Sequence, residues 1–258
     1  MRFRLTLTID KHAFGSALPL NYQYECSAVI YKILSKSDEA FSTWLHDNGF
    51  TSDKKRFKLF TFSRLQAERY RIEGGLLRIL SDTVEWHITF LPERSTQEFI
   101  QGLFTEQEFE LGTQKAKIKC RVQSVEMVAP PMMQETMRFE TLSPICIPLK
   151  REDGSVEYIA PDHPTAAALI RQNVLDKYRA FTGEEFAAKE FAFDIKTLTP
   201  PKSALITVKS GTPEETRVKG FLCRMAVTAP APLMHVMYNC GIGAKGSLGF
   251  GMIEQWRS

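Results

Sequence analysis

This 258-residue sequence predicts an α+β fold of two tandem ferredoxin-like (RRM-like) βαββαβ modules, and three observations support that prediction. Apolar and polar residues alternate along several short stretches, as strands require, and apolar stripes at helical spacing separate them. The order strand, helix, strand, strand, helix, strand can be read twice, before and after Ala129-Pro130-Pro131. A glycine-rich stretch, Gly241 to Gly251, then predicts a loop before a last strand. We therefore expect modules over residues 1–130 and 131–258.

The first module begins with a strand over 3–9, where apolar residues occupy every second position. Asn21 is then the expected N-cap of a helix, because an apolar stripe at helical spacing follows it over 26–34. A second, short helix is expected over 38–48, and Gly49 is its predicted C-terminal stop. These two helices precede the remaining strands of the module.

The rest of the first module is predicted from alternation and from one capping motif. Val84 to Phe90 alternates most clearly, and a tight turn at Ser81-Asp82 is expected to join it to the preceding strand. Ser95 and Glu98 have the spacing of a capping box, which predicts the start of the second packing helix. The expected elements are strands over 57–62, 76–80 and 84–90, a helix from Ser95, and a strand over 117–128.

The second module repeats this order with different residues. Gly183 is the expected stop of its first helix, and Phe191, Phe193 and Ile195 alternate as in a strand. The expected elements are a strand over 137–149, a helix over 165–181, strands over 191–195, 204–209 and 218–227, a short helix over 232–239, and a strand after the glycine loop.

Composition limits the function classes without selecting one. Apolar residues make up 43% and charged residues 24% of the chain, which is ordinary for a globular protein. The net charge of +3 permits a polyanionic partner through a local basic patch. The five cysteines are scattered and form no C-x-x-C pair, so neither a disulfide framework nor a zinc site is indicated. Without a signal peptide or a membrane-length apolar run, a cytoplasmic protein is expected.

The glycine-rich stretch does not match two familiar phosphate-binding motifs. A dinucleotide fingerprint needs a helix and an acidic residue about 20 positions further on, but only seven residues follow Gly251. A nucleoside-triphosphate loop needs Lys before the Ser or Thr, whereas Ser247 follows Gly246 directly. Two interpretations remain, a backbone that approaches phosphates closely and a simple bend before the last strand.

Three kinds of side chain in the first module could carry chemistry. His46 faces away from the apolar side of its helix and lies in the last turn, where the helix dipole favours an imidazolium ion. Tyr31 points away from the apolar stripe of the first helix. The densest basic run follows within a short distance, and it suits either a solvated surface or a nucleic-acid backbone. That run contains Lys54, Lys55, Arg56 and Lys58.

Together these features resemble a known family. The glycine loop has the pattern Gly-x-Gly-x-x-x-Ser-x-Gly-Phe-Gly, Tyr31 precedes His46 in Leu45-His46-Asp47, and Lys58 begins Lys58-Leu59-Phe60-Thr61-Phe62-Ser63. With Thr141-Leu142-Ser143-Pro144-Ile145, these segments resemble the sixth family of CRISPR-associated proteins, the repeat-RNA endoribonucleases of the repeat-associated mysterious protein superfamily. The resemblance spans the chain in the right order. One departure is an extended loop between His46 and Lys58.

The resemblance implies cleavage of CRISPR repeat RNA in precursor transcripts, without metal or cofactor, by attack of a ribose 2′-hydroxyl on the adjacent phosphate. It leaves 5′-hydroxyl and 2′,3′-cyclic phosphate ends. The implied roles are proton transfer for His46, orientation or deprotonation of the 2′-hydroxyl for Tyr31, and charge stabilisation for Lys58. The residues expected to bind RNA are Lys54, Lys55, Arg56, Gly241, Gly243, Lys245, Gly246, Ser247, Gly249 and Gly251.

Several alternatives stay open at this level. Lys54 or Lys55 could supply the catalytic cation instead of Lys58, because the loop that carries them is extended. A non-catalytic relative that only holds guide RNA in a CRISPR effector complex would share the modules and the glycine loop. A small-molecule enzyme or regulatory domain on the same fold is a third reading. Effector-complex proteins and a second copy of the chain are further candidate partners, and no membrane partner is expected.

Overall fold

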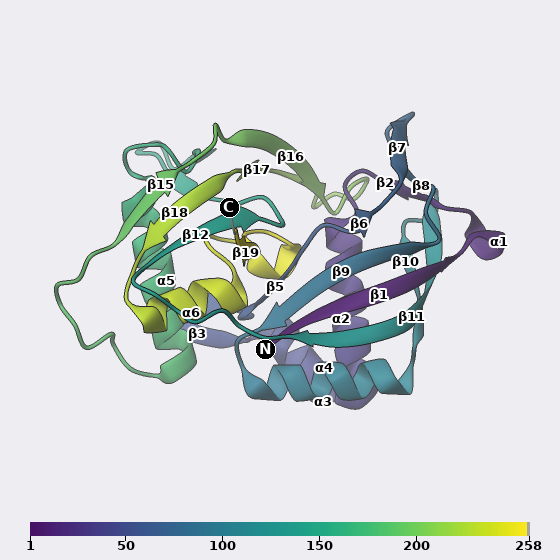
Figure 1. Cartoon of the computed structure of the whole chain (residues 1–258), viewed down its shortest axis with the longest axis horizontal. Coiled ribbons are helices and arrows are strands. Elements are labelled where there is room, and N and C mark those ends of the chain that lie inside the picture. The colour runs from purple at the N-terminus through teal and green to yellow at the C-terminus, as the bar shows by residue number, and fades with distance from the viewer. Residues whose placement is uncertain (257–258) are drawn as a thin grey trace.

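The structure is a computed structural model that describes residues 1–256, and its first half forms an antiparallel sheet (Figure 1). The order β10-β11-β1-β9-β5 contains the ferredoxin-like arrangement of fourth, first, third and second strands, with β10 added at one edge. Helices α2 (Gln23–Ser37) and α4 (Glu93–Thr105) cover one face. The strands are β1 (Arg2–Asp10), β5 (Phe60–Phe62), β9 (Thr83–Phe90), β10 (Glu108–Gly112) and β11 (Lys117–Val128), and β6 (Gln66–Ala67) also pairs with β9.

The second half repeats this arrangement. Its sheet has the order β15-β18-β12-β19, which is again the second, third, first and fourth strand of a βαββαβ module. Helices α5 (Ala166–Thr182) and α6 (Ala231–Cys240) contribute to its core. The prediction of two ferredoxin-like modules is therefore confirmed. The strands are β12 (Thr136–Thr141), β15 (Asp194–Thr197), β18 (Arg224–Thr228) and β19 (Ile253–Gln255).

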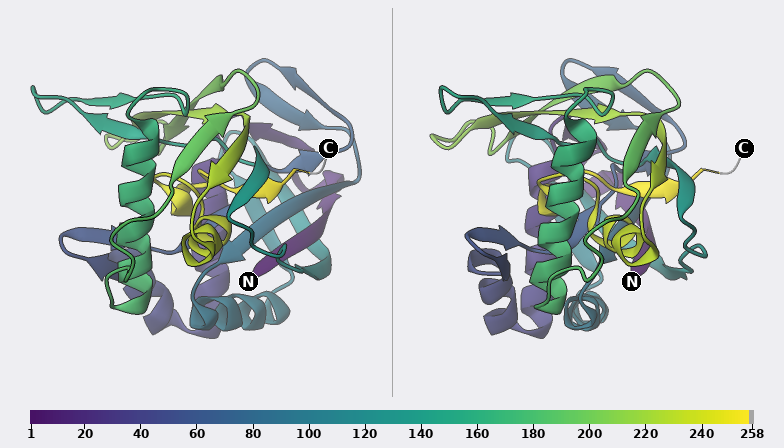
Figure 2. Two further views of the ribbon diagram at one scale, coloured as in Figure 1. Left: turned by 60° about the vertical axis from the view of Figure 1, so that its left-hand side comes forward. Right: turned by 90° about the vertical axis from the view of Figure 1, so that its left-hand side faces the viewer.

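Each sheet has its own apolar core, and the two halves meet through the face of the first sheet that its helices leave free. Alternation sends Trp86 and Ile88 of β9 into the first core, while Thr89 faces the second half. Thr89 Oγ1 lies 3.4 Å from Asn239 Oδ1 on α6. Arg2 is buried between the halves, where its guanidinium donates to the carbonyls of Tyr238 and Ile253, at 2.8 Å each. Both turned views in Figure 2 show α6 and the last strand against this sheet.

Shorter elements extend the two modules, and several of them contribute to the site. Helix α3 (Glu39–Asp47) follows α2, and the hairpin of β3 (Phe50–Ser52) and β4 (Lys55–Phe57) leads from α3 to β5. The other elements are α1 (Lys11–Phe14), the three-stranded sheet of β2 (Ala17–Pro19), β7 (Tyr70–Glu73) and β8 (Leu76–Ile79), the hairpins β13 (Pro148–Lys150) with β14 (Val156–Tyr158) and β16 (Lys202–Val208) with β17 (Thr216–Leu222), and the 3₁₀ turn η1 (Gly246–Leu248).

Five predicted strands differ from the structure. The strand expected over 191–195 corresponds to β15, which begins only at Asp194. The expected strand over 57–62 is interrupted because Leu59 has φ 54°, so only Phe60–Phe62 joins the first sheet. The strand over 76–80 does not form a hairpin with β9 through Ser81-Asp82, because β8 pairs with β2 and β7. The expected strand over 137–149 is divided into β12 and β13, and that over 218–227 is divided at Cys223. Alternation in the sequence does not show these breaks.

Two predicted helix caps are also wrong. The N-cap of α2 is Tyr22, and the Asn21 side chain instead accepts a hydrogen bond from the Thr207 backbone N–H, at 3.2 Å. Helix α4 begins at Glu93, so Ser95 lies inside the helix and Glu98 accepts from the Ser37 hydroxyl at 2.6 Å. Tertiary partners thus take the side chains of Asn21 and Glu98, which local spacing assigns to caps. The strand over 117–128 and the stop at Gly183 are confirmed.

Within residues 1–256, every helix is too short or too polar to cross a lipid bilayer.

Candidate active site and nucleic-acid interface

Tyr31 and His46 come from neighbouring helices and meet edge to face. Tyr31 lies on α2 and His46 in the last turn of α3, and their ring centroids are 5.1 Å apart. The Ser42 hydroxyl donates to the Tyr31 carbonyl at 2.9 Å, which ties α3 to α2 beside the pair. The Tyr31 ring also packs edge-on against Phe60 of β5, with centroids 5.7 Å apart. The two predicted side chains therefore share one corner of the first module.

Lys58 joins the same corner from the link between β4 and β5. Its ammonium group donates to the backbone carbonyl of His46. The Nδ1 atom of His46 lies 2.8 Å from the Asp47 carboxylate, which leaves Nε2 as the ring nitrogen free to meet a substrate. The structure thus brings together Tyr31, His46 and Lys58. We call this group the catalytic corner, after the role proposed for it below.

Exposure and burial give the three groups different properties. The His46 side chain is 67% exposed, so a bound molecule can reach it. Burial raises the pKa of Tyr31 above its ordinary value of 10, so its hydroxyl stays protonated at neutral pH. Burial, and then the charge of Arg56, lower the pKa of Lys58, while the Asp47 carboxylate opposes that shift. A protonated phenol can donate a hydrogen bond, but it is a poor base.

The basic run of the sequence forms the β3–β4 hairpin, and most of its charges have partners in the protein. Lys55 pairs with Asp176 on α5, and the Arg56 guanidinium donates to the Asp47 carbonyl at 3.0 Å. Asp53, at the hairpin turn, pairs with Arg179 of α5 at 2.9 Å. Lys54 is exposed at the same turn, and no ion pair within residues 1–256 includes it. Of the four predicted cations, Lys58 is the one bonded to His46.

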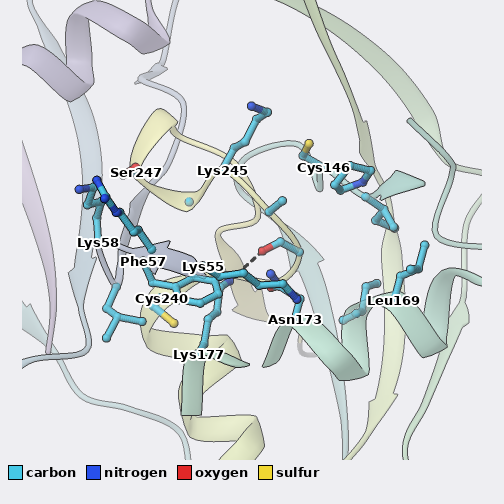
Figure 3. Close-up of a pocket in the computed structure, with 18 of the residues that line it drawn as sticks. Lys55, Phe57, Lys58, Cys146, Leu169, Asn173, Lys177, Cys240, Lys245 and Ser247 are labelled. Atoms are coloured by element: carbon cyan, nitrogen blue, oxygen red, sulfur yellow. Dashed lines mark hydrogen bonds between the residues drawn. The ribbon is translucent and has the colours of Figure 1, made fainter. Parts of the chain in front are cut away.

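A cleft of about 650 Å³ lies beside this corner, between the hairpin, α5 and the glycine loop (Figure 3). Among residues 1–256, those that line the cleft include cations from both halves of the chain and no carboxylate. Such a surface attracts a polyanion, because each phosphate contact releases condensed counterions. Within residues 1–256, no group of three or more His, Cys, Asp or Glu side chains could hold a metal ion. The cations that line the cleft are Lys55, Arg56, Lys58, Lys150, Lys177 and Lys245.

The glycine loop contains two kinds of position. Gly241, Gly243, Gly249 and Gly251 are buried, and they allow the protein's own backbone to pack closely. A Cβ atom on Gly251 would lie 2.0 Å from the Ile242 carbonyl oxygen. At the tip of the loop, exposed Lys245 and half-buried Gly246 and Ser247 line the cleft. The structure therefore gives the buried glycines a packing role and leaves the tip available to a ligand.

Lys177, which is 4% exposed on α5, is a further residue of the site that was not predicted from the sequence. Its ammonium group donates to the carbonyls of Gly241 and Gly243, at 2.7 Å each. One signal was available: Lys177 follows Ile170 and Val174 at helical spacing, so it occupies a position of the buried stripe. A lysine at such a position requires hydrogen-bond acceptors, because an unpaired buried charge is costly.

Comparisons with known proteins agree with this architecture. The family model for CRISPR associated protein Cas6, C-terminal, matches residues 125–255, and that for CRISPR-associated protein Cas6, N-terminal, matches 17–121. The CRISPR-associated endoribonuclease Cas6 1 of Methanocaldococcus jannaschii is 24% identical over 98% of this chain and 92% of its own length. The CRISPR-associated endoribonuclease Cas6 of Pyrococcus furiosus is 25% identical, over 98% and 89%.

A solved structure shares the fold. The product of a Cas6-related gene from Pyrococcus furiosus superimposes with a TM-score of 0.83 and 21% identity, and the match covers 99% of this chain and 98% of that one. The C-terminal family model alone spans more than half of the sequence. The chain belongs to the Cas6 family of CRISPR-associated proteins.

Proposed function

We propose that this protein is an endoribonuclease that cleaves CRISPR repeat RNA in precursor transcripts and so produces guide RNAs. The observation that supports it most is the catalytic corner of Tyr31, His46 and Lys58 beside a cleft lined by cations. The relatives from Methanocaldococcus jannaschii and Pyrococcus furiosus are named as CRISPR-associated endoribonucleases, which agrees with this function. A subunit that only holds guide RNA would need the cleft but not the corner.

We propose a reaction in which the RNA supplies its own nucleophile. A ribose 2′-hydroxyl gives up its proton and attacks the adjacent phosphorus, the bond from phosphorus to the 5′ oxygen breaks, and that oxygen takes up a proton. The products are a 2′,3′-cyclic phosphate and a 5′-hydroxyl. His46 carries the main proton transfer, because an imidazole with an ordinary pKa of about 6.5 can exchange protons at neutral pH. Lys58 stabilises the charge that develops on the phosphate oxygens. No metal ion is part of this proposal.

Of the two roles that the sequence left open for Tyr31, orientation and deprotonation of the 2′-hydroxyl, we propose only the first. Because burial raises its pKa, deprotonation of the 2′-hydroxyl by a tyrosinate is disfavoured. We assign Tyr31 the orientation of the 2′-hydroxyl or of a phosphate oxygen through its O–H donor. Removal of the Tyr31 hydroxyl would then impair the alignment of the RNA, while His46 would still transfer the proton.

RNA binding is proposed for the cleft and for the tip of the glycine loop. Lys245, Gly246 and Ser247 line the cleft opposite the hairpin, and exposed Lys54 extends the basic surface. We also propose that the modules divide near residue 130, in the segment between β11 and β12. The first module then carries the catalytic corner and the second carries the loop that holds the strand.

Incubation of purified protein with repeat-containing RNA in EDTA tests this function. We expect cleavage at one linkage, with a 5′-hydroxyl on one product and a 2′,3′-cyclic phosphate on the other. Tight binding without cleavage would instead favour the guide-RNA-holding function. Absence of both binding and cleavage would favour a small-molecule function on the same fold.

A further inference from the structure

Lys177 is a buried cation on α5 whose side chain donates hydrogen bonds to the glycine loop. Its side chain reaches from the helix toward the loop that carries Lys245 and Ser247 (Figure 3). Two carbonyls, those of Gly241 and Gly243, accept from the ammonium group at 2.7 Å. The two glycines have φ values of 82° and 78°, a backbone region that glycine adopts readily and other residues rarely do. Lys177 therefore fixes the start of the loop by two charge-assisted hydrogen bonds.

The loop fixed in this way lies directly against β5. A Cβ atom on Gly246 would be 2.8 Å from the Phe60 carbonyl oxygen, so the loop tip and the strand are in close backbone contact. The Thr61 hydroxyl donates to the Phe250 carbonyl at 2.8 Å, which joins the end of the loop to the same strand. Phe60 in turn packs on Tyr31 of the catalytic corner. A displacement of the loop therefore acts directly on the cleft, and it reaches the corner only indirectly, through Phe60 and Tyr31.

Neighbouring residues of α5 hold the opposite wall of the cleft. Asp176 pairs with Lys55 of the hairpin and also accepts from Gln172 at 2.9 Å. Arg179 pairs with Asp53 at the hairpin turn. One stretch of a single helix, residues 176–179, thus contacts the β3–β4 hairpin of the first half and the glycine loop of the second.

We propose that Lys177 is a positioning residue that holds the glycine loop in its RNA-binding conformation, so that α5 sets the separation of the two cleft walls. The inference deepens the proposed function and rests on it for the RNA readouts. Without the ammonium group, the carbonyls of Gly241 and Gly243 lose their buried donor, and an unpaired buried acceptor is costly. The loop then moves to rehydrate them, and Lys245 and Ser247 leave their places in the cleft.

Three variants test the proposal. Lys177→Met removes the charge and the donors at similar volume, and Lys177→Arg keeps both. Arg171→Met removes one positive charge from the same helix, where Arg171 stacks on Phe191 and lies outside the lining of the cleft. For each protein we would measure thermal unfolding, hydrogen exchange of residues 241–251, RNA affinity, and the cleavage rate of saturated RNA.

For Lys177→Met we expect loop amides to exchange on the order of tenfold faster, with β1 and β9 unchanged, because local opening of the loop becomes easier. RNA affinity should fall about tenfold, whereas cleavage of saturated RNA should fall no more than about threefold, since His46 is untouched. Lys177→Arg should restore most of the affinity, and Arg171→Met should resemble the wild type. If Lys177→Met shows no cooperative unfolding, Lys177→Gln takes its place in the same comparison.

Two results would overturn the proposal: loop exchange in Lys177→Met equal to that of the wild type, or equal losses of RNA affinity in Lys177→Met and Arg171→Met. The hydrogen-exchange readout uses free protein and does not depend on RNA. A wild-type protein that fails to cleave repeat RNA would therefore remove the proposed function, while the exchange result still decides whether Lys177 positions the loop.

Discussion

The catalytic corner and the glycine loop lie against the same strand, β5, but they are built in opposite ways. His46 in the corner is 67% exposed, and its partners are a neighbouring carboxylate and the ammonium group of Lys58. Gly243 and Gly251 in the loop are buried, and each packs against a backbone carbonyl at a distance that excludes a side chain. The corner therefore presents the His46 side chain at the surface, whereas the loop holds its own backbone in place.

This difference separates two kinds of mutational effect. A surface side chain such as His46 can be removed without opening a cavity, so its loss should affect chemistry and leave the fold intact. A buried glycine with positive φ and no room for a Cβ cannot be replaced without moving the backbone, so its loss should affect the fold first. Mutations in the two regions should therefore affect activity and stability separately.

His46→Ala should give the largest effect. We expect cleavage of saturated RNA to fall by about 10²–10⁴-fold, because a positioned general acid or base contributes this much. RNA affinity and the midpoint of thermal unfolding should stay close to those of the wild type, since the side chain is exposed. Single-turnover cleavage and RNA titration measure the two quantities. A variant that cleaves at the wild-type rate would contradict the assignment.

Lys58→Ala should come next, with Lys54→Ala as its matched control. Lys58 is bonded to the His46 carbonyl, and we expect cleavage to fall by about 10²-fold when charge stabilisation at the phosphate is lost. Lys54 is exposed at the hairpin turn, so Lys54→Ala should weaken RNA binding by only about twofold and reduce the salt dependence slightly. If Lys54→Ala instead reduced the cleavage rate more than Lys58→Ala, the catalytic cation would lie on the hairpin.

Gly251→Ala tests the loop, with Gly211→Ala as its control. Both glycines have φ 76°, but a Cβ on Gly251 would meet the Ile242 carbonyl at 2.0 Å, whereas nothing lies within 4 Å of one on Gly211. We expect Gly251→Ala to lower the free energy of unfolding by roughly 3 kcal/mol and Gly211→Ala by roughly 1 kcal/mol. Chemical denaturation measures both, and equal losses would show that the close packing does not matter.

Tyr31→Phe should give the smallest effect, about tenfold in cleavage rate, because it removes a single hydrogen bond. The raised pKa keeps the hydroxyl protonated from neutral pH up to its ordinary value of 10, so no tyrosine ionisation should appear in the rate between pH 6 and 9. The variant should lower the rate without changing the shape of that profile. An alkaline limb that Tyr31→Phe abolishes would instead make Tyr31 a base.

The sequence predicted the order of strands and helices better than the positions where strands break and the strands with which they pair. Alternation and apolar stripes identified the two βαββαβ modules, because burial on one face dictates those patterns. These patterns did not show the break at Leu59 or the pairing of β8 with β2 and β7, since alternation carries no information about strand partners. Asn21 and Ser95 have sequences typical of caps, but long-range contacts and an earlier helix start give them other places.

The candidate site was predictable where it resembles a family motif and hidden where it depends on tertiary contacts. Tyr31, His46 and Lys58 are brought together as expected, although their roles stay predictions. The pairing of Lys55 with Asp176 and the bonds from Lys177 to the loop join residues more than 60 positions apart. Such pairs follow from the packing of α5 between the hairpin and the loop, which local sequence spacing does not encode.

The account depends on attack by the RNA's own 2′-hydroxyl at the catalytic corner. A repeat RNA with one 2′-deoxynucleotide immediately before the cleaved linkage tests this most directly. It should bind like the all-ribose RNA, because the phosphates are unchanged, and should remain uncut at that linkage in EDTA. Cleavage of the substituted RNA at the original linkage and at the original rate would contradict the mechanism.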